Sequence, residues 1–190
     1  FAGDLAAIWP EGAGPDNSAK LGLAVSGGPD SVALLLLANA ALPGRIEAAT
    51  VDHGLRAESA DEAAAVARLC AGLGIPHASL KVEVAPGNLQ SQARKARYAA
   101  LGGWLAERGL AALASAHHAD DQAETLLARL NRASGVAGLA GVRARGQVPG
   151  TNFLLLRPLL GWRREELGQV VAAAGVTAAQ DPSNRDDRFD

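Results

Sequence analysis

The sequence predicts an α/β fold, an open, doubly wound parallel sheet with helices on both faces. Short apolar runs, which are typical of buried parallel strands, alternate along the chain with longer stretches of helical periodicity. Elements in this βαβα order pack with right-handed crossovers, which place helices on both sides of the sheet. With 190 residues, 48% of them hydrophobic, the chain is long enough to bury a core. We therefore expect a single domain over residues 1–190.

Each expected element follows from its local pattern. Continuous apolar runs bounded by polar or turn residues are the expected strands: Leu21–Val25, Ile46–Val51, His77–Val84 and Leu110–Ser115. Stretches of helical pattern are the expected helices: Val32–Ala41, Ser59–Leu73, Leu89–Arg108 and Asp120 to about Asn131.

The last third of the chain is less regular. Residues 133–152 are rich in glycine and arginine, and we expect them to form a mobile loop. A short apolar run, Phe153–Leu156, then comes before Arg157-Pro158. A last helix is expected at Arg163–Ala174, within a C-terminal helical segment of about residues 158–190.

A hexapeptide rich in turn residues, Ser26-Gly27-Gly28-Pro29-Asp30-Ser31, separates the first expected strand from the first helix. Such a turn directs backbone N–H groups at one point, where the helix dipole adds partial positive charge. Glycine allows close approach of the backbone, and Ser26 and Ser31 offer hydroxyl groups. The pattern therefore predicts a site for phosphate or pyrophosphate.

The carboxylate of Asp30 adds a second requirement to this turn. Beside a bare polyphosphate it would repel the ligand, whereas a Mg²⁺ ion between them accommodates both charges. The alternative interpretation is a turn in which serine and aspartate only cap the helix. The hexapeptide is neither a Walker loop, which needs a following Gly-Lys-Ser/Thr, nor the dinucleotide pattern GxGxxG.

Polar residues gather where the expected strands end. The first strand ends at the glycine turn, the second at Asp52-His53 and the fourth at His117–Asp121. Because ligands of open α/β sheets bind beyond the carboxyl ends of the strands, these residues predict one common site. Asp52 and His53 are expected to contact the nucleoside part of a nucleotide, although a simple turn with a hydrogen-bonded histidine is the alternative.

The segment His117–Thr125 contains two histidines, two aspartates and a glutamate. A metal site is one interpretation, but adjacent histidines at a strand end point in different directions. In a helix that starts near Asp120, Asp121 and Glu124 share a face and can hold Mg²⁺ or the ammonium group of an amine substrate. Asp120 is expected to cap that helix, which leaves the other two carboxylates for binding. Capping combined with a solvated helix face is the alternative.

Basic residues gather on one expected helix and in the last third of the chain. Arg94, Arg97 and Tyr98 lie within one turn of a helix, next to Lys95. A solvated helix face explains such a group, and the alternatives are neutralisation of phosphate charge or contact with an RNA backbone. Further arginines that could contribute to a surface for an anionic polymer are Arg129, Arg132, Arg143, Arg145, Arg157, Arg163 and Arg164.

Composition excludes several other classes of protein. The formal net charge is −2, so no overall basic field indicates nucleic-acid binding. A single cysteine, Cys70, excludes an internal disulfide and a CxxC metal or iron–sulfur site within this sequence. No apolar stretch is long enough to span a membrane and no signal peptide is visible, so we expect no membrane partner and a cytoplasmic location. The sequence starts at Phe1 rather than Met, so we expect it to be part of a longer protein or a short form.

Several blocks together resemble one enzyme family. The hexapeptide matches the pyrophosphate-binding PP-loop pattern SGGxDS of the ATP pyrophosphatases, whose fold is Rossmann-like. The whole set of blocks resembles the N-terminal catalytic domain of the tRNA(Ile)-lysidine synthetases, and the blocks occur in the same order as in that family. The blocks are SGGPDS, VDHGLRAES, ARKARYAAL, HHADDQAETLLARLNRASGVAGLAG, RPLL and DPSN.

The resemblance implies a ligase that uses ATP and Mg²⁺ to attach L-lysine to the wobble cytidine of an isoleucine tRNA with a CAU anticodon. It implies that Ser26–Ser31 bind ATP, that Asp30 binds the metal, and that Asp30, Arg97, Asp121 and Glu124 are catalytic. Asp121 and Glu124 would also bind lysine. By position in the basic segments, the tRNA-binding residues would be Arg94, Arg97, Arg129 and Arg132.

Two other functions remain open from the sequence. A PP-loop tRNA thiolase, or another ATP-dependent tRNA-modifying enzyme, shares the adenylation step. A nucleotide-binding or tRNA-binding module without catalysis would bind ATP and release no pyrophosphate.

Overall fold

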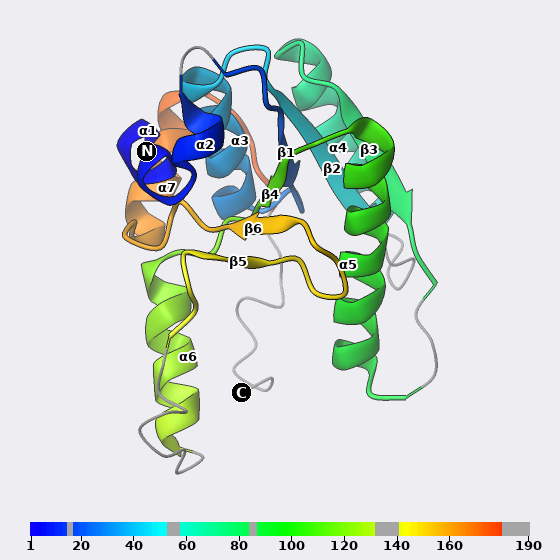
Figure 1. Ribbon diagram of the computed structural model, residues 1–190, viewed down its shortest axis with the longest axis vertical. Coiled ribbons are helices and arrows are strands. Elements are labelled where there is room, and N and C mark those ends of the chain that lie inside the picture. Colours follow the sequence, from blue (N-terminus) through cyan, green and yellow to red (C-terminus); the bar gives the residue numbers. More distant parts are fainter. Residues whose placement is uncertain (15–16, 53–57, 84–86, 132–140, 180–190) are drawn as a thin grey trace.

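The fold matches the predicted class in a computed structural model that describes residues 1–14, 17–52, 58–83, 87–131 and 141–179 (Figure 1). Within these residues the strands form one sheet in the order β3-β2-β1-β4-β6-β5. The strands are β1 (Leu21–Ala24), β2 (Ile46–Asp52), β3 (His77–Lys81), β4 (Ala112–Ala114), β5 (Arg145–Gln147) and β6 (Leu154–Leu156). The helices are α1 (Ala2–Ile8), α2 (Pro10–Ala13), α3 (Pro29–Ala41), α4 (Glu58–Gly72), α5 (Leu89–Arg108), α6 (Ala119–Asn131) and α7 (Arg164–Ala173).

Helices cover both faces of the sheet, as the βαβα order predicts. On one face, buried residues of α1, α3, α4 and α7 form a common apolar cluster with β1. On the other face, Tyr98, Leu101 and Leu105 of α5 pack with Leu113 and Leu155 of the sheet. Figure 1 shows α3 and α7 on one side of the sheet and α5 on the other. The predicted fold class, an open doubly wound sheet, is confirmed.

The chain changes direction across the sheet next to β1. β2 and β3 follow on one side of β1, whereas β4 pairs with its other side, and all these pairs are parallel. This arrangement is a topological switch point, where the loops that leave two neighbouring strands diverge and open a crevice. The loops after β1 and β4 are the glycine turn and the segment that leads into α6.

Within the described part of the expected loop, residues 141–152, the structure contains a strand. Residues 145–147 form β5, which pairs antiparallel with β6 and closes the sheet at one edge. A tight turn joins them: the N–H of Thr151 donates to the carbonyl of Val148 at 3.0 Å, with Pro149 second in the turn and Gly150 third at a φ of +78°. Proline followed by glycine at these positions is the signature of a type II turn.

The N-terminal helices are a second difference from the sequence prediction. Leu5 and Trp9 lie one helical turn apart and are each 1% exposed, in the same cluster as α3. The first eight residues therefore form a helix because this pair seals the edge of the core. His53, Val84 and Arg132, together with residues 133–140 of the expected loop and residues 180–190 of the expected C-terminal segment, lie outside the described residues.

Candidate active site at the switch point

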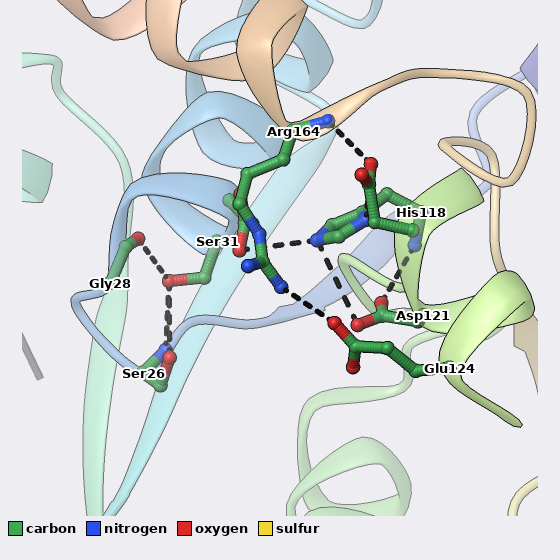
Figure 2. A network of polar contacts seen from close by, with 9 residues as sticks. Ser26, Gly28, Ser31, His118, Asp121, Glu124 and Arg164 are labelled. Carbon is green, nitrogen blue, oxygen red and sulfur yellow. Dashed lines mark hydrogen bonds and ion pairs between the residues drawn. The ribbon is translucent and has the colours of Figure 1, made fainter. Parts of the chain in front are cut away.

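The glycine turn joins β1 to α3 and is stabilised from inside by one hydroxyl. The Oγ of Ser31 accepts from the backbone N–H groups of Ser26 at 3.2 Å and Gly27 at 3.1 Å, and it donates to the carbonyl of Gly28 at 2.9 Å. Figure 2 shows Ser31 between these residues. The sequence analysis expected Ser31 to offer its hydroxyl to a phosphate, whereas in this structure that hydroxyl holds the turn. Gly27 has a φ of +99°, a conformation that residues with a side chain rarely adopt.

The donors that face an anion are therefore the first N–H groups of α3. Pro29 occupies the first helical position without an N–H, and the N–H of Val32 already donates to Gly28 at 3.0 Å. The N–H groups of Asp30 and Ser31 lie in the first turn, where a helix supplies no acceptor. α6 also begins directly after a strand at the switch point, so two helix N-termini add positive potential there.

A buried histidine connects the two sides of the crevice. His118, 1% exposed, precedes α6, and its Nε2 lies 3.4 Å from Asp30 Oδ2 and 3.7 Å from Asp121 Oδ1 (Figure 2). The turn after β1 and the first turn of α6 are thereby joined at one side chain. Sequence reasoning weighed His118 as part of a metal cluster and as one of the polar residues at a strand end, but gave it no contact of its own. Its position at the end of a strand, beside the switch point, was the signal for this role.

The two aspartates at the start of α6 do not divide their roles as the sequence predicted. Asp121 Oδ2 accepts from the backbone N–H of His118 at 2.9 Å, so Asp121 caps its own helix. Asp120 Oδ2 instead accepts from the N–H of Arg164, at the start of α7, at 2.8 Å. This bond is the main cause of the lowered pKa of Asp120. The expectation that Asp120 caps α6 was wrong, because α6 begins one residue earlier, at Ala119.

Asp121 and Glu124 still share one face of α6, as predicted. Asp121 is about one-third exposed, and Glu124 is 66% exposed. Glu124 Oε1 lies 3.5 Å from a guanidinium nitrogen of Arg164, a long contact at an exposed position (Figure 2). Exposed pairs of this kind contribute little stability. The two carboxylates therefore remain accessible to a cationic group.

A cation fits Asp30 better than any other acidic residue here. Its Oδ1 is buried and has no hydrogen-bond partner, which is an unusual state for a carboxylate oxygen. Mg²⁺ commonly binds through one or two carboxylates together with substrate phosphates. Among the described residues, no group of three or more His, Cys, Asp and Glu side chains is arranged to hold a metal alone. The donor set fits an ion that arrives with a phosphate ligand.

The basic residues of α5 lie beside the end of β4. The guanidinium carbons of Arg94 and Arg97 are each 5.1 Å from the ring centre of Tyr98, within the range of cation–π contacts. Burial lowers the pKa of His117 to about 4, and the charges of Arg157, Arg97 and Arg94 act in the same direction. His117 Nδ1 also lies 2.9 Å from the hydroxyl of Ser115. This side of the crevice thus combines cations with a neutral imidazole.

Of the remaining predicted site residues, Asp52 and Arg129 lie in the described chain, and the others lie outside it. Asp52 ends β2, next to β1, and its carbonyl accepts from Val82 at 3.0 Å. Arg129 lies near the end of α6. His53 and Arg132 belong to the undescribed residues. No helix in the described part of the chain is long and apolar enough to cross a bilayer.

A glycine turn at the switch point of an open α/β sheet, flanked by carboxylates, is typical of nucleotide-binding domains. The chain belongs to the PP-loop domain family, which matches residues 5–190. Membership of this ATP-binding family implies ATP as the nucleotide. The tRNA(Ile)-lysidine synthase of Novosphingobium aromaticivorans is 56% identical over 177 residues, which cover 92% of this chain and 54% of the relative. That of Ruegeria pomeroyi is 52% identical over 176 residues, or 90% of this chain and 42% of the relative.

These relatives confirm the resemblance that the sequence blocks indicated. The chain spans about half the length of the curated relatives it matches. Among solved structures, the U34-tRNA thiolase NcsA from Methanococcus maripaludis has a TM-score of 0.73 at 19% identity, covering 95% of this chain and 65% of the thiolase. The NH3-dependent NAD synthetase from Campylobacter jejuni has a TM-score of 0.57 at 16% identity, covering 92% of this chain and 71% of the synthetase. At these identities the structures support the fold alone.

Proposed function

We propose that this domain catalyses lysidine formation, in which ATP activates the wobble cytidine of tRNA(Ile) with a CAU anticodon and L-lysine is then attached. The observation that carries the proposal is the contact of Asp30 and Asp121 with one histidine. This contact supports the proposal because it joins the glycine turn, here called the ATP turn for its proposed ligand, to the start of α6, which carries Asp121 and Glu124. The similarity to tRNA(Ile)-lysidine synthases over 92% of the chain supports the choice of substrates.

In the first step, the C2 oxygen of the cytidine attacks the α-phosphorus of ATP and pyrophosphate leaves. The glycine turn and the N-terminus of α3 would bind the phosphates, while Asp52 and His53 would contact the nucleoside. Asp30 would hold Mg²⁺, whose charge offsets that of the phosphates. Arg97 would stabilise the charge on the phosphate of the activated cytidine.

In the second step, the lysine side-chain amine attacks C2 of the activated cytidine, and AMP leaves with the oxygen. Asp121 and Glu124 would bind the α-ammonium group of lysine, because their carboxylates share an exposed face beside Asp30. Arg94 and Arg129, with Arg132, would contact the tRNA. The C–N bond between lysine and C2 forms as the C–O bond between C2 and AMP breaks, so the step needs no reactant besides lysine and the activated tRNA.

Labelled lysine tests this proposal directly. The protein at its natural length is supplied with ATP, Mg²⁺, labelled lysine and the isoleucine tRNA, with a methionine tRNA of the same anticodon as control. Incorporation is expected only with the isoleucine tRNA, and it should fall at least tenfold in Asp121→Ala and Glu124→Ala. Undiminished incorporation in both variants would show that lysine binds elsewhere.

A tRNA thiolase is the alternative function that the sequence left open, and the thiolase NcsA shares this fold with a TM-score of 0.73. The structure of that thiolase is described with its [4Fe-4S] cluster. Such clusters are held by several cysteines, whereas this chain contains one. Cys70 is buried, and burial raises its pKa to about 11, so it is a poor nucleophile or ligand. Transfer of labelled sulfur to tRNA in place of lysine would establish the alternative.

A further inference from the structure

Arg157, one of the arginines that the sequence offered for contact with an anionic polymer, lies at the end of β6. It directly follows β6, which pairs parallel with β4 so that Leu156 lies opposite Ala114. The N–H of Ser115 donates to the carbonyl of Leu156 at 3.0 Å, so the two strands end level with each other. Arg157 therefore lies at the same rim as the residues that lead into α6.

Arg157 joins Arg94 and Arg97 of α5 in an arginine cluster around Tyr98. Tyr98 is 3% exposed, its ring centre lies 5.1 Å from the guanidinium carbons of both Arg94 and Arg97, and it is close enough to Arg157 to act on the pKa of that guanidinium. A guanidinium nitrogen of Arg157 also donates to the carbonyl of Arg143 at 2.7 Å. These contacts fix the position of the Arg157 guanidinium on the α5 side of the sheet.

The arginine cluster lacks a counterion within the part of the chain that the structure describes. No carboxylate of the described residues lies in ion-pair range of its three members, although the like charges repel one another. Arg157 Nε is buried without a hydrogen-bond acceptor. Burial and the charge of Arg94 lower the pKa of Arg157. A buried N–H without an acceptor and three unpaired cations point to an anion that binds here.

We infer that the arginine cluster binds a phosphodiester group of the substrate RNA, with Arg157 as its innermost donor. Guanidinium groups match the geometry of phosphate oxygens, and arginine is enriched at RNA contacts. The ATP turn is two strands away, roughly 10 Å across the sheet, and α3 packs on the opposite face from α5. An RNA strand carries one phosphate per nucleotide, so it can extend from the ATP turn to the arginine cluster. The triphosphate of ATP would instead bind the N–H groups at the start of α3. The inference rests on the proposed function in taking RNA as the substrate.

The test compares Arg157→Gln and Arg94→Gln with Arg68→Gln as a control. Arg68 is an exposed residue of α4, so its substitution removes the same charge at a distant position. Binding of the isoleucine tRNA and of an unrelated tRNA is measured against salt, together with ATP binding. We expect Arg157→Gln to weaken both RNAs at least tenfold and to lower the log–log salt slope by about one. ATP affinity should change less than twofold, and Arg68→Gln should resemble the unaltered protein. Arg94 lies nearer the surface than Arg157, so its variant tests the cluster even where Arg157→Gln fails to fold.

The outcomes separate the inference from the proposed function. Loss of ATP affinity in Arg157→Gln with RNA binding intact would assign the site to a nucleotide phosphate and overturn the inference. Unchanged RNA affinity and salt slope in a folded Arg157→Gln protein would also overturn it, while leaving the proposed function in place. Absence of tRNA binding in the unaltered protein would overturn both.

Discussion

Replacing Ser31 by alanine tests whether one hydroxyl holds the ATP turn in shape. Ser31 is 6% exposed, and its Oγ serves two N–H groups and one carbonyl of the turn. Gly27 is buried, so its N–H would lose its acceptor, whereas Ser26 is exposed and water can replace the bond. One buried donor without a partner costs about 1–3 kcal/mol. We expect a free energy of unfolding lower by about 2 kcal/mol. We also expect the ATP affinity to fall roughly tenfold, a loss of about 1.4 kcal/mol in binding free energy, because the turn that would bind the phosphates is no longer held in shape.

Urea unfolding and calorimetric ATP titration measure the two effects separately. For the stability measurement, Ser26→Ala is the matched control, since the Ser26 hydroxyl donates only to Ser31 at 3.3 Å and its residue is exposed. Ser31→Thr keeps the oxygen and should retain most of the ATP affinity. A Ser31→Ala protein with unchanged stability and unchanged ATP affinity would refute this account of the turn.

Three further substitutions test other parts of the site and its support. Asp30→Asn should abolish the tightening of ATP binding by Mg²⁺, because it neutralises the carboxylate with the unpaired buried oxygen; equal Mg²⁺ dependence in both proteins would contradict this. His117 has a pKa of about 4 when folded and an ordinary value of 6.5, so the unfolded chain takes up a proton between these values. Stability should therefore fall by up to roughly 3 kcal/mol as pH drops from 6.5 to 4, and His117→Asn should remove that part of the urea pH profile. Gly22→Ala should lower stability by about 1–3 kcal/mol, since its Cβ would lie 2.8 Å from Trp104, whereas Gly168→Ala, with open space, should not destabilise.

Local chemistry made the glycine turn and the surrounding elements predictable. Ser26–Ser31 lie between an apolar strand and an apolar helix, so their conformation depends on neighbours in sequence. The β5–β6 hairpin was predictable in principle from Pro149-Gly150 between two short extended runs. The abundance of glycine and arginine around it favoured a loop instead, which shows that composition is a weaker signal than turn chemistry.

The contacts between distant segments were not predictable from the sequence. Asp120 accepts from Arg164, 44 residues away, and this bond exists only because α6 and α7 begin side by side. His118 meets Asp30 because β1 and β4 are neighbours in the sheet although 88 residues separate the two side chains. Arg157 reaches Tyr98 for the same reason, through the pairing of β6 with β4. Sequence patterns identify residues that can do chemistry, and strand order decides which of them meet.

The most direct test of a shared crevice for ATP and lysine is Glu124→Gln in the protein at its natural length. Glu124 is exposed and its contact with Arg164 is long, so the substitution leaves the fold and the ATP turn unaltered. Pyrophosphate release and lysine incorporation are measured in one reaction with ATP and the isoleucine tRNA, beside Glu165→Gln as an exposed control on α7. The account predicts that, in a single turnover with enzyme in excess over tRNA, Glu124→Gln releases pyrophosphate at a rate within threefold of the unaltered protein while lysine incorporation falls at least tenfold. Equal loss of both products, or of neither, would contradict it.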